Sequence, residues 1–89
     1  QLPMARQAFL CRSAKALFQA AWHCISAGER IVMVFSSKRK MNAFCEVLKE
    51  FRIGYKAYSA ETSDQIRRDD LGSVNTVWAT SDLRVLCYT

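Results

Sequence analysis

Three segments of the sequence that are expected to form strands each end in an aromatic residue followed by a hydroxyl residue. The hydroxyl residues are Ser36 and Ser37 after the first strand, Ser59 after the second and Thr89 after the third. Ligands of open α/β sheets bind outside the carboxyl ends of the strands, so these side chains would line one edge of a sheet. Each residue taken alone could simply cap the next helix, but the repetition after three strands favours a binding edge.

Three consecutive cations, Lys38, Arg39 and Lys40, follow Ser36 and Ser37 directly. They fall where a helix is expected to begin, and a helix N-terminus carries a partial positive charge that favours acidic residues in its first turn. Cations in that position oppose the helix dipole, which makes sense if an external anion binds there. Free amides, hydroxyls and cations at one helix start would form a phosphate site. The alternative is a solvated basic turn without a function.

The hydrophobic pattern predicts the first elements that position these residues. Apolar residues recur at three- and four-residue spacing within residues 4–27, which predicts one long amphipathic helix. Ile31–Phe35 is an apolar run without polar alternation, typical of a strand covered on both faces. A second helical stripe then consists of Met41, Phe44, Cys45, Leu48 and Phe51.

The second half of the chain continues the alternation of strands and helices. Tyr55–Tyr58 is expected to be a short strand and Arg84–Tyr88 a third strand. Between them, Thr62 and Gln65 have the spacing of a capping box that opens a helix through Leu71. Three glycines follow the helical segments and could take the left-handed conformation that ends a helix: Gly28, Gly54 and Gly72.

The order helix, strand, helix, strand, helix, strand indicates an α/β fold with helices flanking a parallel sheet in three layers, because parallel neighbours need crossover connections. With 89 residues the chain is one domain or part of one, so residues 1–89 are treated as a single unit. Trp22, Phe44 and Phe51 are expected to be buried against the sheet.

Composition limits the classes of partner and compartment. The net charge of +5 on so short a chain favours an acidic partner, most commonly nucleic acid, although many basic domains are merely soluble. No apolar run reaches the ~20 residues that span a bilayer, and no signal pattern begins the sequence, so a soluble intracellular protein without a membrane partner is expected. The cysteines have neither zinc nor redox spacing, which favours buried free thiols in the reducing nucleus or cytosol: Cys11, Cys24, Cys45 and Cys87.

Other chemistry is disfavoured by residue type. A phosphoacceptor receiver needs acidic residues after the first strand, where Ser36 and Ser37 stand. A serine or cysteine hydrolase needs a base within reach, but His23 lies in the middle of a helix, where a partly buried structural histidine is expected. The acidic residues after the second strand are too scattered to predict a metal site: Glu61, Asp64, Asp69 and Asp70. The sequence therefore assigns neither a catalytic nor a metal-binding residue.

The order of these features resembles a known family. The segment "GERIVMVFSSKRKMNAFCEVLKEF" is similar to motif IV and its following helix in the second RecA-like domain of superfamily 2 helicases. There a strand ends in Ser or Thr, and the start of the helix holds a nucleic-acid phosphate. "YKAYSAETSD" resembles the next strand and turn, and "LRVLCYT" resembles the strand that enters motif V, whose threonine would be Thr89. Within the superfamily, "VWATSDLRVLCYT" is similar to the approach to motif V in herpesvirus-type replication origin-binding proteins.

The resemblance covers most of the chain from Gly28 onward and implies a partial RecA-like helicase C-terminal domain. The sequence contains no GxxxxGK[ST] loop, no DExx-type metal site, no complete motif V and no motif VI arginines. ATP and Mg²⁺ would therefore be bound only by the parent protein, an ATP-dependent helicase, between this domain and a first RecA-like domain. This chain alone is expected to bind no cofactor and to hydrolyse no ATP.

Two hypotheses follow. In the first, the chain is part of a helicase and contacts the backbone of a single strand, DNA more than RNA, without reading bases. The contacting residues would be Ser36, Ser37, Lys38, Arg39, Ser59 and Thr89. In the second, the chain is a stand-alone, non-catalytic α/β module that binds a phosphorylated ligand or a protein at the same edge.

Overall fold

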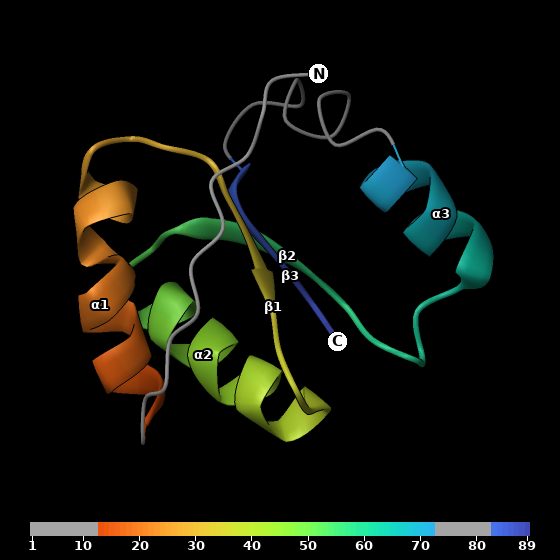
Figure 1. Ribbon diagram of the computed structural model, residues 1–89, viewed down its shortest axis with the longest axis horizontal. Coiled ribbons are helices and arrows are strands. Elements are labelled where there is room, and N and C mark those ends of the chain that lie inside the picture. The colour runs from red at the N-terminus through yellow and green to blue at the C-terminus, as the bar shows by residue number, and fades with distance from the viewer. Residues whose placement is uncertain (1–12, 73–82) are drawn as a thin grey trace.

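The computed structural model describes residues 13–72 and 83–89, which form a three-stranded parallel sheet flanked by helices (Figure 1). The elements in chain order are α1 (Ala14–Ser26), β1 (Ile31–Val34), α2 (Lys38–Glu50), β2 (Gly54–Tyr58), α3 (Asp64–Gly72) and β3 (Leu83–Tyr88). The mixed α/β class and the alternating order of elements are confirmed. Residues 4–12 of the predicted first helix lie outside the described residues.

The sheet has the order β1-β3-β2, with β3 parallel to both neighbours. Near its start, Val85 of β3 pairs with Ile31 and Tyr55. At its end, Tyr88 pairs with Val34 and Tyr58. Because all three strands run the same way in this register, their carboxyl ends meet at one edge of the sheet.

The main hydrophobic core lies between one side of the sheet and the pair α1 and α2. Sheet residues Met33, Val85 and Cys87 meet Phe18 of α1 and Phe44 of α2 in this core. The predicted buried face of α2 is confirmed for four of its five residues, whose side chains are 5% exposed or less: Met41, Phe44, Cys45 and Leu48. Cys45 and Cys87 are buried free thiols, as expected, whereas Cys24 is only partly buried. Cys11 lies outside the described residues.

Two of the three aromatic residues expected against the sheet are only half covered. Phe44 is fully buried, but Trp22 is 46% exposed and Phe51 is 52% exposed. The ring of Phe18 lies between them, with centroids 4.6 Å from Phe51 and 5.4 Å from Trp22. The prediction is wrong for these two residues because Phe51 caps the end of α2 and Trp22 packs beside it, so both rings cover the rim of the core.

The opposite side of the sheet carries a smaller cluster around Tyr58 and Leu86, both fully buried. Helix α3 lies beyond this side, away from α1 and α2 (Figure 1). The expectation that the first strand is covered on both faces is wrong at Val34, which is 66% exposed. In the described sheet β1 is an edge strand, so its end lacks the cover that the central strand β3 receives.

The start of α1 differs from the prediction of one helix through residues 4–27. Ser13 has an extended backbone, with φ −140° and ψ 161°, and its hydroxyl accepts a hydrogen bond from the Ala16 amide at 3.1 Å. This is the geometry of an N-cap, so α1 begins at Ala14 and a continuous helix is excluded. At the other end, Gly28 has φ 82°, which confirms its predicted left-handed position after the helix.

Two further helix boundaries correct the sequence-based prediction. The left-handed residue after α2 is Arg52, with φ 56°, while Gly54 begins β2 instead. The N-cap of α3 is Ser63, whose hydroxyl accepts from the Ile66 amide at 3.3 Å. The predicted capping box is wrong because the Thr62 hydroxyl accepts a hydrogen bond in the preceding turn.

Candidate functional site

The carboxyl ends of the three strands bring the predicted hydroxyl residues to one edge of the sheet. The amide of Phe35 donates to the carbonyl of Tyr88 at 2.8 Å, and the amide of Thr89 donates to the carbonyl of Tyr58 at 3.2 Å. These two hydrogen bonds extend the parallel pairing just past the strand ends. Ser36, Thr89 and Ser59 therefore follow neighbouring strands in the order β1, β3, β2, as the sequence pattern predicts.

The start of α2 combines a hydroxyl cap with three cations. The hydroxyl of Ser37 accepts from the amide of Lys40 at 3.2 Å, which makes Ser37 the N-cap of α2. No acidic residue occupies the first turn, which holds Lys38, Arg39 and Lys40. Ser36, just before the cap, is exposed. The capping interpretation is thus correct for Ser37, although a hydroxyl that accepts one bond still has a proton to donate.

Lys38 has an intramolecular partner that the sequence did not reveal. Its Nζ forms an ion pair with the Glu61 carboxylate, which lies in the turn after β2. The pair connects the start of α2 to the end of a strand at the far side of the edge. The side chains of both residues are substantially exposed, at 46% for Lys38 and 77% for Glu61. An anion that approaches Lys38 must therefore compete with Glu61.

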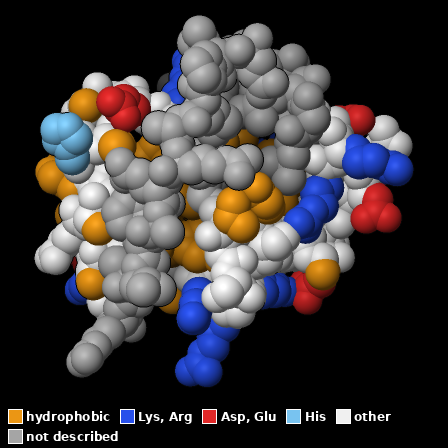
Figure 2. Space-filling view, in the orientation of Figure 1, with side chains coloured by type: hydrophobic (Ala, Val, Ile, Leu, Met, Phe, Trp, Pro, Cys, Tyr) orange, Lys and Arg blue, Asp and Glu red, His pale blue; other side chains and the backbone are white. Residues whose placement is uncertain are grey.

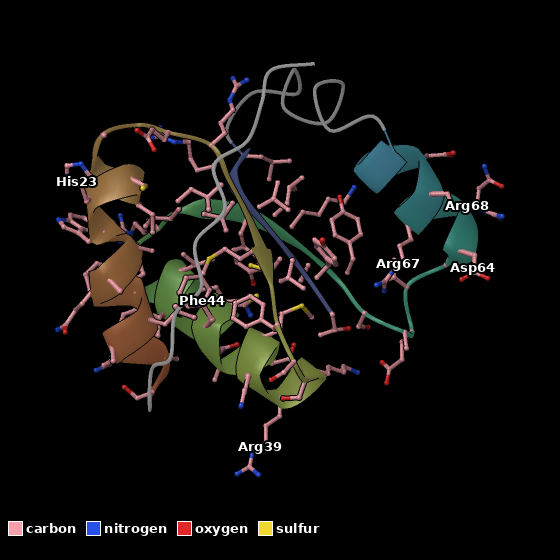
Figure 3. The ribbon with its side chains drawn as sticks, in the orientation of Figure 1. His23, Arg39, Phe44, Asp64, Arg67 and Arg68 are labelled. Carbon is pink, nitrogen blue, oxygen red and sulfur yellow. The ribbon has the colours of Figure 1, made fainter. Side chains whose placement is uncertain are left out.

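Arg39 and Lys40 are the cations that remain available at this helix start. Both side chains are exposed, and within residues 13–72 and 83–89 neither has a carboxylate at ion-pair distance. Figure 3 shows Arg39 projecting from the start of α2 away from the protein. In the space-filling view, basic side chains protrude at the bottom of the molecule, where α2 begins (Figure 2). This corner offers positive charge to solvent.

Ser59 is placed at the edge but is used by the local turn. Its side chain is only 7% exposed, and its hydroxyl accepts from the Glu61 amide at 3.2 Å. Its own amide donates to the Thr62 hydroxyl at 2.9 Å. The turn that these bonds form holds Glu61 in position for its ion pair with Lys38. Ser59 therefore stabilises the turn at this edge, but its buried side chain is not exposed to a ligand.

Arg67 is a residue of this edge that sequence reasoning missed. Its guanidinium donates to the main-chain oxygen of Thr89. The side chain is half-buried, and Figure 3 shows it directed from α3 toward the sheet, whereas the neighbouring Arg68 points away. The spacing from the Ser63 cap places Arg67 in the first turns of α3, and this could have suggested a second cation at the strand ends.

The remaining candidate groups lie elsewhere or have no reactive setting. His23 was expected to be partly buried, but it is exposed in the last turn of α1 and points outward (Figure 3). A hydrogen bond with Cys45, together with burial, raises the pKa of the Cys87 thiol, which keeps it protonated and unreactive. No group of His, Cys, Asp or Glu in the described part of the chain is arranged to hold a metal.

Among the described helices, none has both the length and the apolar character needed to cross a membrane. No family model, curated protein or solved structure matches this chain. Its function must therefore be argued from the geometry of the carboxyl edge.

Proposed function

We propose that the carboxyl edge of the sheet binds the backbone phosphates of single-stranded nucleic acid, as part of the second RecA-like domain of a superfamily 2 helicase. The single observation that carries the proposal is the convergence at this edge of three strand ends, the basic start of α2 and Arg67 of α3. Ser36, Ser37 and Thr89 contribute hydroxyl groups, while Arg39 and Lys40 contribute charge.

The helix start supplies three kinds of phosphate ligand within one turn. The first backbone amides of α2 have no acceptor within the helix. Among them, the Lys40 amide donates to the Ser37 hydroxyl. The hydroxyl of Ser37 can donate its proton to a phosphate oxygen while it accepts from that amide. Arg39 and Lys40 add positive charge where the helix dipole already favours an anion. A phosphate bound here requires no rearrangement of the backbone.

Lys38 and Arg67 take different parts in this site. Lys38 joins a bound phosphate only when it leaves Glu61, so the carboxylate weakens binding and discriminates against weakly charged ligands. Arg67 keeps Thr89 against α3 and gives the end of β3 a fixed position in the edge. Because these groups contact phosphate and main chain, the site has no means of reading bases.

The motor chemistry belongs to the larger protein in this proposal. ATP, Mg²⁺ and a first RecA-like domain would be supplied outside residues 1–89, and no step at the carboxyl edge passes through them. The sequence contains no GxxxxGK[ST] phosphate loop, and the described residues contain no group of three or more His, Cys, Asp or Glu side chains that could hold a metal ion. The chain alone should therefore show no ATPase activity, with or without nucleic acid.

The test measures the affinity of the chain for a fluorescently labelled oligothymidylate by anisotropy over a range of salt concentrations. Each cation that neutralises a phosphate contributes about 0.7 to the slope of log affinity against log salt for single strands. Arg39→Ala should lower the slope by about that amount. Glu61→Gln should raise affinity at low salt, because it frees Lys38 and removes a negative charge. A control, Lys15→Ala on the exposed side of α1, should leave the slope unchanged.

The outcomes separate the proposal from its alternative. If Lys15→Ala and Arg39→Ala lower the slope equally, the attraction is diffuse charge and the edge is no site. If neither changes it, the basic turn is only solvated. The second hypothesis, a stand-alone module for a phosphorylated ligand or a protein, then becomes the better explanation of the edge.

A further inference from the structure

A hollow of about 380 Å³ opens at the other end of the sheet, where β2 and β3 begin and where α1 and α2 end. Its lining includes Trp22 and Ile25 of α1, Phe51 and Arg52 at the end of α2, and Arg84 of β3. This volume is within the range of about 300–1,000 Å³ that is usual for small-molecule sites. None of these residues belongs to the carboxyl edge.

The apolar wall of the hollow is formed by two aromatic side chains that the core leaves uncovered. Trp22 is 46% exposed and Phe51 is 52% exposed, with ring centroids 6.4 Å apart and planes inclined by 56°. Phe18 stacks against Phe51 from the interior and supports that ring from behind. Two supported aromatic rings with exposed surface are suited to cover the flat face of another ring.

The polar part of the hollow is positive. Arg52 and Arg84 line it, and no carboxylate is among its lining residues. One guanidinium nitrogen of Arg84 donates to the Ile25 carbonyl at 3.3 Å, at the end of α1. The Nε of Arg84 is buried and has no hydrogen-bond partner within the described part of the chain. A buried donor without an acceptor is costly, so a ligand oxygen that draws the Arg84 side chain toward the hollow would restore a lost hydrogen bond.

The backbone of Arg52 adds an independent indication. This residue adopts φ 56° directly after α2, a left-handed position that glycine normally occupies and that strains other residues. Strained backbone conformations of this kind are concentrated at functional sites, where the strained residue has a part in binding or catalysis. Here the residue in the strained position carries a cation and lines the hollow.

We propose that the hollow binds a small anion in which a planar aromatic ring is joined to a phosphate or a carboxylate. The ring would lie against Trp22 and Phe51, and the oxyanion would pair with the guanidinium groups of Arg52 and Arg84, both of which line the hollow. Guanidinium groups match both oxyanions because their planar donors can bind two oxygens at once. The hollow is thus a second binding site, at the amino end of the sheet, and does not depend on nucleic-acid binding at the carboxyl edge.

The experiment is a two-dimensional ¹H–¹⁵N NMR titration that follows the indole N–H of Trp22 and the Nε–H of Arg84. Two probes carry both parts of the ligand: adenosine 5′-monophosphate and indole-3-acetate. Either should give saturable shifts of both signals. Adenosine and inorganic phosphate each carry only one part, so each should bind at least about tenfold more weakly if both parts contribute.

Arg52→Gly is the decisive variant, since it removes one cation while it relieves the left-handed strain, so weaker binding cannot be ascribed to unfolding. It should weaken the better probe about three- to fivefold, as expected for an exposed charged contact. Arg68→Ala is the matched control, because it removes one exposed positive charge from α3, outside the hollow. The dissociation constant of the better probe should be the same for Arg68→Ala as for the unaltered chain.

Three results would overturn the proposal. The first is the absence of saturable shifts at Trp22 and Arg84 up to about 10 mM of both probes, which corresponds to no useful affinity. The second is an equal loss of binding in Arg68→Ala and Arg52→Gly, which would mean diffuse attraction. The third is a response confined to the first turn of α2. Arg39→Ala, which tests the carboxyl edge, should leave binding in the hollow unchanged, so the two proposals can fail separately.

Discussion

Phe44 and Phe51 lie seven residues apart on the same predicted helical stripe, yet the structure assigns them very different contributions to stability. Phe44 is fully buried, with its ring centroid 5.4 Å from that of Phe35 and 6.3 Å from that of Phe18. Phe51 is 52% exposed and has one stacked neighbour, Phe18, at 4.6 Å. A comparison of Phe44→Ala with Phe51→Ala therefore measures how much more stability a fully buried ring contributes than a half-buried one.

The magnitudes follow from the area that each ring removes from water. A fully buried phenylalanine covers roughly 150–250 Å², worth about 4–6 kcal/mol at about 25 cal/mol per Å². Replacing Phe44 by alanine retains part of that area but leaves a cavity, so Phe44→Ala should lower the free energy of unfolding by about 3–5 kcal/mol. Because about half of the Phe51 ring is covered, Phe51→Ala should cost about 2 kcal/mol.

The assay is urea-induced unfolding followed by far-ultraviolet circular dichroism, with the midpoints compared at constant slope. A domain of this size has a total stability of about 5–15 kcal/mol, so Phe44→Ala could leave too little folded protein to measure. Phe44→Leu then serves in its place, with an expected loss of about 1 kcal/mol. If Phe51→Ala costs as much as Phe44→Ala, or if Phe44→Ala is harmless, the assignment of core and rim is wrong.

Three further predictions test other parts of the fold. Arg52→Gly should raise the free energy of unfolding by about 0.5 kcal/mol, because relief of the left-handed strain exceeds the entropy that glycine adds to the unfolded chain; Arg52→Ala should give no such gain. Ser37→Ala should lower it by about 1 kcal/mol, as the Lys40 amide loses its cap, and the urea midpoint would show this loss. In thiol labelling read by peptide mass spectrometry, Cys24 should react in the folded protein while Cys45 and Cys87 react only after unfolding.

The strands and the buried face of α2 could be predicted from the sequence because both depend on local periodicity. Strands β1, β2 and β3 differ from the predicted segments by one residue at one end each. The spacing of apolar residues also identified the inner face of α2, but this spacing does not show how deeply each side chain of that face is buried. Phe51 continues the stripe of Phe44, and only the position of the helix end relative to the core shows that it lies on the rim.

The helix caps show a different limit. Thr62 and Ser63 are adjacent hydroxyl residues, and either could cap a helix by the same hydrogen bond. The choice depends on the preceding turn, where the amide of Ser59 takes the Thr62 hydroxyl and leaves Ser63 for α3. Likewise, Gly54 has the residue type of a left-handed position, but the geometry of the α2 end assigns that conformation to Arg52.

At the carboxyl edge, the sequence predicted which residues meet but not how they are already bonded. Ser36, Ser59 and Thr89 follow from the strand ends alone. The Lys38–Glu61 ion pair and the contact of Arg67 with Thr89 depend on how the turn after β2 and helix α3 lie against the sheet. Contacts of that kind join distant segments, and residue spacing along the chain cannot encode them.

The Lys38–Glu61 pair also determines what kind of anion the carboxyl edge could retain. An exposed ion pair is worth at most about 1 kcal/mol, so a phosphate can displace Glu61 from Lys38 at a cost of no more than about fivefold in affinity. A phosphodiester that meets Arg39 and Lys40 at the same time can offset that cost, whereas a ligand that reaches Lys38 alone cannot. Glu61→Gln should therefore increase affinity by a similar factor, up to about fivefold, for inorganic phosphate and for a long single strand, because both must displace the same carboxylate to reach Lys38. A gain for inorganic phosphate without one for the single strand would mean that the strand does not use Lys38.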